Sequence, residues 1–314
     1  MIVDGHDSDG CHRPSIAEAY APAHVKTCSP PWPCEHRPMA TKRSKPTKKA
    51  PGRLYTGMGG WTFAPWRGPF YPEGLVQKRE LEYASRQVSA IEINGTYYRS
   101  PDIDTYRRWA AETPEDFVFS VKAPRHIVQS RALASTGERI GRFLDGAIGL
   151  GDRLGAVLWQ FLPTRKFDPD DIAGFLDLLP DRHEGVALRH AVEVRHESFM
   201  DERWLTLARD RGVATVFTDS PDHPSFADLT GPFVYARLMR SRAREKHGYP
   251  AKELKAWAAH AAAWTAGDDP ADLPHVVEPQ ASGQPRDAFV FFISAAKERN
   301  PAAAVALGKL ADDA

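Results

Sequence analysis

Cysteine is scarce in this chain. Only three of the 314 residues are cysteines (Cys11, Cys28 and Cys34), and the sequence after Cys34 has none. A disulfide framework cannot therefore support the fold. This cysteine usage is typical of proteins in a reducing compartment, so we predict a cytoplasmic location.

Long apolar runs and an excess of charge of one sign are also missing. No apolar stretch approaches the ~20 residues needed to cross a bilayer, so no membrane partner is expected. The 41 Lys and Arg residues balance the 41 Asp and Glu residues, which excludes a general attraction to nucleic acid. The glycines at 57–60 do not form G-x-G-x-x-G, and no P-loop follows them. The sequence therefore identifies no cofactor.

The first 53 residues differ from the remainder. They are rich in Pro, His and Cys and end in the basic run TKRSKPTKKAPGR. Such a segment cannot bury enough apolar surface to offset its ordering entropy, so we predict a disordered extension at 1–53 and a folded domain at 54–314. Initiation at Met39 is an alternative that would leave a short basic tail.

From Leu54 onward, short apolar segments alternate with amphipathic ones. We expect eight strands, at residues 54–58, 89–94, 117–122, 155–161, 190–195, 213–218, 233–238 and 288–293. Helical patterns lie at 102–113, 137–154, 168–179, 201–212, 251–264 and 300–313. Asp168 or Asp170, and Asp201, are placed to cap helix starts, and Gly212 to end a helix.

Strands that alternate with helices predict a parallel sheet, and eight such units match a (β/α)₈ barrel of the TIM type. An open doubly wound sheet is the alternative. The side-chain alternation favours the barrel, because one face of each strand is apolar and the other carries ionisable groups. In an open sheet both faces would be covered by helices, and charges on either face would be anomalous.

The ionisable and amide side chains of this second face are expected to point towards the barrel axis near the carboxyl ends of the strands. They are Glu92, Asn94, Lys122, Gln160, Glu193, Arg195 and Arg237. Their simplest interpretation is a buried ion-pair network that fills the barrel. Barrel interiors usually hold branched apolar residues, and burying ion pairs seldom stabilises a protein. We therefore favour a ligand-binding site.

Five segments of the sequence form a set of motifs in a fixed order. They are GMGGWTFAPWRGPFYPEGL (57–75), IEINGTYY (91–98), LGAVLWQFLP (154–163), VEVRHESF (192–199) and YARL (235–238). The set resembles the YecE-like family, also called domain of unknown function 72. The resemblance covers about residues 54–310 and implies a barrel of the TIM kind without an established activity.

The chain departs from the family pattern at three places. Ile127-Val128-Gln129 replaces Ile-Thr-His, Met239-Arg240 replaces His-Gly, and Ile293-Ser294 replaces an Asn pair. Mechanisms that use those His or Asn side chains are not expected here.

The predicted site has a slight cationic excess, and the planar fork of Arg suits phosphate or carboxylate. We therefore expect an anionic ligand, with phosphate favoured, that the protein binds and turns over as a phosphoester hydrolase or isomerase. Glu193 is the expected proton-transfer group, with Glu92 as its partner. The expected ligand-binding residues are Asn94, Lys122, Gln160, Arg195, His196, Arg237, Trp61 and Tyr97.

Three alternatives remain. A divalent metal could be held by Glu92, Glu193, His196, Asp219 and His126, although no HxH or HExxH pattern occurs. A non-catalytic nucleic-acid-binding protein could use the basic tail, the cluster at 237–249 and the aromatic loops, whose rings would stack on bases. The third alternative is a vestigial site in a barrel that serves as a scaffold.

Overall fold

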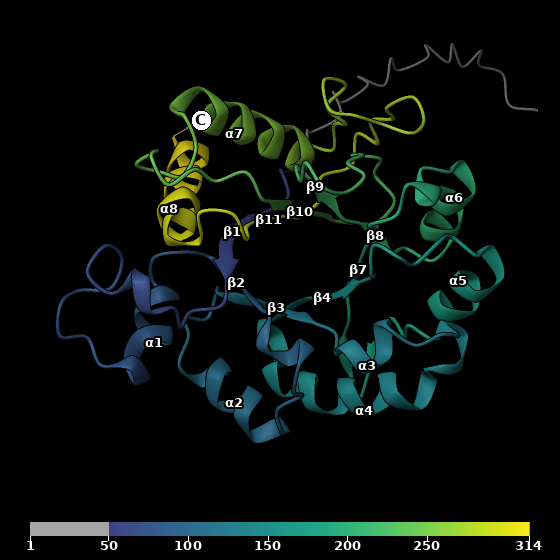
Figure 1. Ribbon diagram of the computed structural model, residues 1–314, viewed down its shortest axis with the longest axis horizontal. Coiled ribbons are helices and arrows are strands. Elements are labelled where there is room, and N and C mark those ends of the chain that lie inside the picture. The colour runs from purple at the N-terminus through teal and green to yellow at the C-terminus, as the bar shows by residue number, and fades with distance from the viewer. Residues whose placement is uncertain (1–49, 314) are drawn as a thin grey trace, which may run out of the picture. The chain divides into compact units, whose positions relative to one another are not determined.

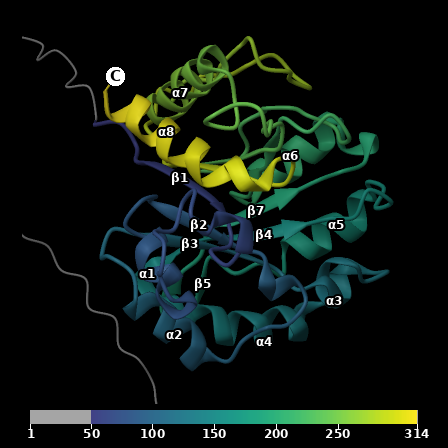
Figure 2. The same ribbon diagram turned by 60° about the vertical axis from the view of Figure 1, so that its left-hand side comes forward.

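A computed structural model describes residues 50–313 of the chain. Within this range a sheet of parallel strands closes into a ring with the helices outside it (Figure 1). After rotation the strands remain central and the helices remain peripheral (Figure 2). The extension predicted at 1–53 lies almost entirely outside the described residues and stays a prediction. None of the helices in the described part is long and apolar enough to span a membrane.

The strands follow one another around the ring in chain order. They are β1 (Leu54–Gly59), β2 (Ala90–Ile93), β3 (Val118–Lys122), β4 (Leu154–Gln160), β7 (His190–Glu193), β8 (Ala214–Thr215), β9 (Phe217–Thr218), β10 (Val234–Leu238) and β11 (Ala288–Phe292). β1 pairs with both β2 and β11, so the first and last strands close the ring. β8 pairs with β7, and β9 pairs with β10. The two short strands, separated by Val216, therefore together occupy one strand position of the barrel. The predicted (β/α)₈ barrel is confirmed.

Each predicted helical segment contains a helix. The α-helices are α1 (Glu80–Ala84), α2 (Ile103–Ala111), α3 (Arg125–Val128), α4 (Gly137–Ala147), α5 (Pro169–Leu176), α6 (Glu202–Asp210), α7 (Ala251–Ala266) and α8 (Asn300–Asp312). The 3₁₀ segments are η1 (Ala64–Trp66), η2 (Gln77–Arg79), η3 (Gly95–Tyr97), η4 (Leu133–Ser135), η5 (Ile148–Arg153), η6 (Glu197–Phe199) and η7 (Lys297–Arg299). A small hairpin, β5 (Arg182–His183) and β6 (Val186–Ala187), and the short helices α1 and α3 were not predicted.

Side-chain caps fix two of these helix starts. The Asp168 carboxylate accepts hydrogen bonds from the first backbone N–H groups of α5, and the Asp201 carboxylate accepts one at α6. These bonds satisfy donors that a helix leaves unpaired at its start, as the sequence predicted. Gly212 has φ 61° just after α6, a conformation that glycine adopts without a steric cost.

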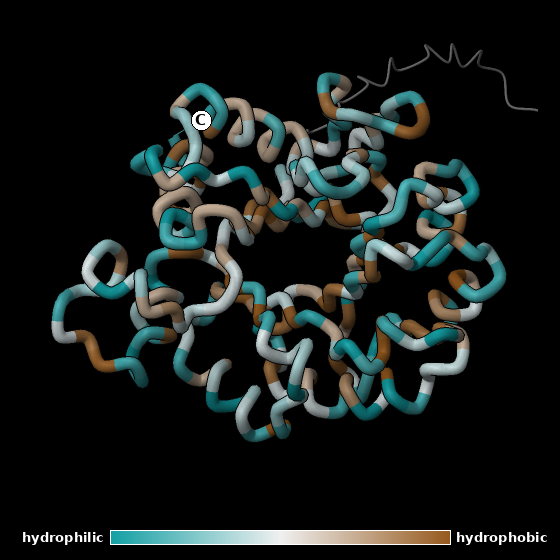
Figure 3. The backbone as a smooth tube through the Cα atoms, in the orientation of Figure 1, coloured by the Kyte–Doolittle hydropathy of each residue, from teal (hydrophilic) through white to brown (hydrophobic). Residues whose placement is uncertain are grey.

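The alternation of side chains separates two apolar cores. The outward residues of the strands pack under the helices, and they include the predicted Ile91, Ile93, Phe119, Val121, Val192 and Val194. A second cluster fills the barrel itself with alternate residues of the same strands: Tyr55, Ala90, Val118, Ala156, Leu158, Ala191, Ala214, Val216, Phe233, Tyr235, Phe289, Phe291 and Ile293. Hydrophobic segments follow the barrel wall in Figure 3. Because the lumen is packed, polar chemistry is confined to its mouth.

Candidate active site at the barrel mouth

The polar residues predicted to face the axis gather at the carboxyl ends of the strands. Glu92 comes from β2, Glu193 from β7 and Arg237 from β10, and all three are at most 2% exposed. On its strand, each of them occupies the inward-facing position that follows the last apolar residue of the barrel core. Three distant chain segments are therefore brought into one charged group.

Arg237 joins the two carboxylates. Its Nε donates to Glu92 Oε2 at 3.0 Å, and its Nη2 donates to Glu92 Oε1 at 3.0 Å, a bidentate pair. Its Nη1 donates to Glu193 Oε2. Burial alone would lower the pKa of Arg237, but Glu193 and Glu92 outweigh burial and raise it. Arg237 is therefore a permanent cation whose three nitrogens are already engaged.

Glu193 accepts hydrogen bonds from three side chains. Arg195 Nε donates to Oε1 at 2.5 Å, and Gln160 Nε2 lies 2.9 and 3.0 Å from the two oxygens. Burial favours the neutral acid, but Arg237, Arg195 and Gln160 outweigh it and lower the pKa of Glu193 to about 2. Both oxygens are saturated with donors, so Glu193 is a fixed anion at neutral pH.

Glu92 is held on its other side by neutral groups. Tyr235 Oη donates to Glu92 Oε2 at 2.8 Å, and Asn94 Nδ2 donates to Oε1 at 2.9 Å. Ser120 Oγ lies 2.6 Å from the Tyr235 hydroxyl. Tyr235 and Ser120 were not predicted as site residues. The available signal was parity, because Tyr235 lies two residues before Arg237 and Ser120 two before Lys122.

Lys122 extends the network from β3 towards the opening. Its Nζ donates to Gln160 Oε1 at 2.7 Å and lies 4.3 Å from the centre of the Tyr97 ring. Burial and the nearby Arg237 lower the pKa of Lys122 to about 8, against the opposite influence of Glu92 and Glu193. Among the described ion pairs, none joins Lys122 to a carboxylate within 4.0 Å. The Lys122 amine therefore titrates closer to neutral pH than that of an ordinary lysine.

A cavity of about 350 Å³ opens above this network. It is lined by Gly59, Asn94, Lys122, Gln160, Arg195, Arg237, Ile293, Ser294, Lys297 and Asn300. The volume lies within the usual range of small-molecule sites, about 300–1,000 Å³. Four of the lining residues are cationic, and no carboxylate of the described residues belongs to the lining. The two glutamates lie beneath the cavity, already bound to Arg237.

The loop after β11 supplies one wall of the cavity in an uncommon backbone conformation. Ser294 and Ala295 have φ 58° and 46°, which non-glycine residues rarely adopt. Asn300 at the start of α8 holds this loop, since its Nδ2 donates to Ser294 O at 3.2 Å and its Oδ1 accepts from Ser241 Oγ at 2.9 Å. Backbone strain of this kind clusters at functional sites.

Lys297 and Asn300 were not predicted as site residues. Burial lowers the pKa of Lys297, whose Nζ lies 4.4 Å from the centre of the Phe63 ring. The signal that could have found both is their position, in a polar segment directly after the last strand.

Gly59, at the end of β1, lines the cavity beside the wall supplied by the loop after β11, because β1 pairs with β11. A Cβ there would lie 3.0 Å from Asn94 Nδ2 and 3.1 Å from Ile293 Cδ1.

Three predicted ligand-binding residues lie outside the lining. His196 Nδ1 accepts from the backbone N–H of Ser198 and so caps η6. Trp61 packs edge-on against Trp109, with 5.1 Å between ring centres. Tyr97 contributes its ring beneath Lys122, and its hydroxyl accepts from Gln129 Nε2 at 2.7 Å. The structure thus brings together seven of the ten predicted residues around the cavity and its floor.

The residues considered as metal ligands do not gather into one metal site within the described part of the chain. Within residues 50–313, no group of three or more His, Cys, Asp and Glu side chains is placed to hold a metal ion. Asp219 instead accepts hydrogen bonds from the backbone of Met239 and from Tyr249 Oη at 3.1 Å. Burial raises the pKa of Asp219 to about 6.

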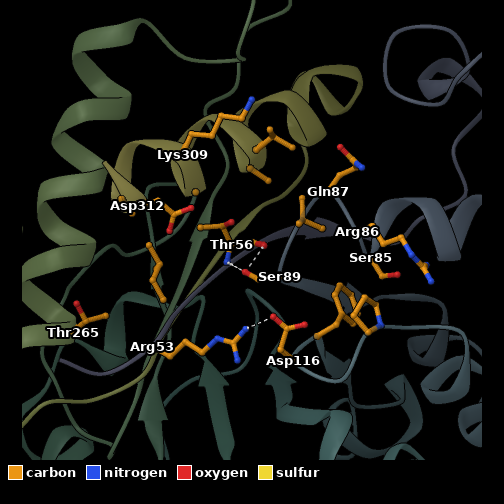
Figure 4. Close-up of a pocket in the computed structure, with 18 of the residues that line it drawn as sticks. Arg53, Thr56, Ser85, Arg86, Gln87, Ser89, Asp116, Thr265, Lys309 and Asp312 are labelled. Carbon is orange, nitrogen blue, oxygen red and sulfur yellow. Dashed lines mark hydrogen bonds and ion pairs between the residues drawn. The ribbon is translucent and has the colours of Figure 1, made fainter. Parts of the chain in front are cut away.

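A larger hollow, of about 1130 Å³, lies at the opposite end of the barrel. Thr56 and Ser89 from the strand starts line it, with Arg53 and Asp116 joined at 3.1 Å (Figure 4). This amino-terminal end of a TIM-type barrel is commonly associated with stability, and catalytic residues lie at the carboxyl end. We therefore assign the candidate site to the smaller cavity at the mouth.

Comparison with known proteins agrees with this fold. Residues 55–314 match the family model described as "Protein of unknown function DUF72". The UPF0759 protein YecE of Escherichia coli (strain K12) is 31% identical over 175 residues, which are 53% of this chain and 59% of that protein. The match thus spans little more than half of that relative. The predicted family resemblance is confirmed.

Two solved structures have the same fold. A DUF72 family protein from Thermotoga maritima superposes with a TM-score of 0.64 at 23% identity, over 83% of this chain and 99% of the other. One from Enterococcus faecalis V583 gives 0.61 at 18% identity, over 83% and 98%.

Proposed function

The chain belongs to the DUF72 family, and we propose that its barrel mouth binds a small anionic ligand, with a phosphate group favoured, and turns it over. The observation that carries this proposal is the charge of the cavity. Arg237 already neutralises much of the charge of Glu92 and Glu193, while Lys122, Arg195 and Lys297 line the cavity without a lining carboxylate. An anion that enters the cavity would contact these cations directly, because the carboxylates Glu92 and Glu193 lie beneath the cavity and not in its lining.

The remaining hydrogen-bond donors support the same ligand. Among the described residues, Arg195 uses its Nε for Glu193, which leaves both of its Nη groups to form a fork for two oxygens of an anion. The Lys122 ammonium has three N–H donors and uses one of them for its hydrogen bond to Gln160. Charge-assisted hydrogen bonds from these groups would contribute about 1.5–3 kcal/mol each to binding.

The roles of the two glutamates follow from their bonding. A proton-transfer group works best when its pKa lies near the operating pH. Glu193, with a pKa of about 2, is too weak a base at neutral pH, whereas Lys122, with a pKa of about 8, suits the task. We therefore propose Lys122 for proton transfer, in place of the expected Glu193, and propose Glu92 and Glu193 as positioning residues for Arg237 and Arg195.

The test is a thermal-shift screen of the purified protein against phosphate-bearing compounds, with neutral sugars and amines of similar size in parallel. We expect stabilisation by phosphate compounds, and a loss of that shift in Arg195→Met. A matched control is Arg203→Met, because the Arg203 side chain is 71% exposed and its ion pair among the described residues is with Asp201. Shifts with neutral sugars or amines alone would refute the anion proposal.

The nucleic-acid alternative rests on exposed basic and aromatic loops. Two features weigh against it: Trp66 and Tyr71 are fully buried, and Arg242 is paired with Glu253. Tyr98, at 74% exposed, is the ring best placed for stacking. Binding through many backbone phosphates would weaken by orders of magnitude between about 50 and 200 mM salt, and a single small phosphate would lose far less.

A further inference from the structure

Lys122 is an amine placed to react as well as to bind. Its Nζ is at the wall of a cavity sized for a small molecule, held by one hydrogen bond to Gln160 and by the face of the Tyr97 ring. The hydrogen bond and the ring fix the direction of Nζ, and neither is an acid that would hold the amine as an ion pair. The charged groups around it are Arg237 on β10, Glu92 on β2, and Glu193 and Arg195 at the end of β7.

A lysine becomes a nucleophile when its surroundings favour the neutral amine. Burial and the positive charges of Arg237 and Arg195 do this for Lys122. The same cations would hold an anionic group of a ligand beside it. A carbonyl carbon one or two bonds from that anionic group would then lie within reach of Nζ.

We propose that Lys122 forms an imine with a small aldehyde or ketone that carries a carboxylate or phosphate group, bound in the cavity at the barrel mouth. This inference rests on the proposed anion site and adds the ligand's reactive group. The Nζ lone pair attacks the carbonyl carbon and forms a C–N bond. The two amine protons pass to the carbonyl oxygen, which leaves as water while the C=N bond forms. No oxidant, reductant or metal is consumed.

The imine would conserve the charge of the site. A protonated imine is a cation, so it can replace the lysine ammonium beside the bound anion. Arg195 and Lys297 would hold the carboxylate or phosphate, and Asn94, with its Nδ2 bound to Glu92, offers Oδ1 as an acceptor for a ligand hydroxyl. In the imine, a carbon next to the former carbonyl carbon would lose a proton more easily, which is what carbanion chemistry requires.

The experiment traps the imine by reduction. The full-length protein is incubated with cyanoborohydride and one of three probes: glyoxylate, glycolaldehyde phosphate or uncharged glycolaldehyde. Peptide mass spectrometry then gives the labelled fraction of Lys122 and of the exposed Lys78 and Lys252. At about pH 7.5 a lysine of pKa about 8 has on the order of 10² times more free amine than an ordinary lysine of pKa about 10.4. We expect at least a tenfold preference for Lys122 with the anionic probes.

Two variants separate this inference from the anion site. Lys122→Arg keeps a cation but has no amine that can form an imine, so labelling at that position disappears while sulfate still raises the melting temperature. Lys78→Met, at an exposed position, labels at Lys122 as the wild type does. Excess sulfate should suppress the labelling of Lys122 and leave that of Lys252 unchanged.

Two outcomes would overturn the proposal of an imine with an anionic carbonyl compound. Labelling spread evenly over the exposed lysines, in a protein that sulfate stabilises, would refute the imine and leave the anion site intact. Equal labelling of Lys122 by glycolaldehyde and the anionic probes, without suppression by sulfate, would show a reactive lysine with no anion site. That second result would also refute the proposed function.

Discussion

Replacing Arg237 with Met should destabilise the barrel strongly. The guanidinium is the only cation that bonds to Glu92 among the described residues, and it also bonds to Glu193. Both carboxylates are fully buried. Removing one partner of a buried ion pair leaves an uncompensated charge, which typically costs about 3–5 kcal/mol of the free energy of unfolding. We expect a loss in that range for Arg237→Met at neutral pH.

The loss should shrink as the pH falls. In the variant, Glu193 keeps Arg195 but loses Arg237, the larger of the two cationic influences that lower its pKa, so burial favours its protonated form more than in the wild type. The folded variant then takes up protons at a higher pH than the wild type does. Lowering the pH towards about 4 therefore stabilises the variant relative to the wild type.

Urea denaturation at several pH values measures both effects through the midpoint and the slope. The control is Arg242→Met, because the Arg242–Glu253 pair is exposed at 38% and 41% and should contribute no more than about 1 kcal/mol. A cost below about 1 kcal/mol for Arg237→Met, where 3–5 kcal/mol is expected for a broken buried pair, would refute the reasoning. So would a cost that does not change with pH.

Three further predictions concern the same network. Sulfate keeps its charge above pH 6, so any change in its affinity there reports on the protein. Its affinity for the wild type should fall as the pH rises through about 8, because Lys122 loses its proton. Calorimetry should show no such fall with pH for Lys122→Met. The pKa of Glu193 is about 2 in the folded protein and about 4.3 in the unfolded chain, so the stability that ionised Glu193 contributes is complete above about pH 4.3 and is lost towards pH 2. Acid unfolding of Glu193→Gln should lack this loss of stability between about pH 4.3 and pH 2. An acid-unfolding profile equal to that of the wild type would contradict this prediction. Arg195→Met should weaken sulfate binding about 10-fold or more, as expected for a charge-assisted hydrogen bond, and an undiminished affinity would exclude Arg195 from the site.

The barrel and the composition of its mouth could be predicted because strand alternation is a local property. Each of Glu92, Glu193 and Arg237 lies one residue away from outward-facing apolar residues of its own strand, so the pleat places it on the opposite, inward face. Once the strands close into a ring, residues on that face must meet. Helix starts were predictable for the same reason, since a cap such as Asp201 acts within one turn.

Hydrogen-bond pairing could not be predicted, because it depends on distances between strands far apart in the sequence. Nothing local shows that Arg237 would engage both glutamates, or that this would leave Lys122 without a carboxylate partner. Glu193 was expected to transfer protons because its type suits the task; four hydrogen bonds from three side chains now favour a fixed anion. Lys297 was missed because it lies in a short 3₁₀ segment after the last strand, where no periodicity indicates direction.

Calorimetric titration of sulfate into the wild type and into the double variant Lys122→Met/Arg195→Met tests the anion site most directly. We predict that the wild type binds sulfate at one site and that the double variant shows no measurable binding. The double control Lys78→Met/Arg203→Met, at exposed positions, should bind as the wild type does. Equal sulfate affinity in the wild type and in Lys122→Met/Arg195→Met, or no binding by either, would contradict an anion site at the barrel mouth.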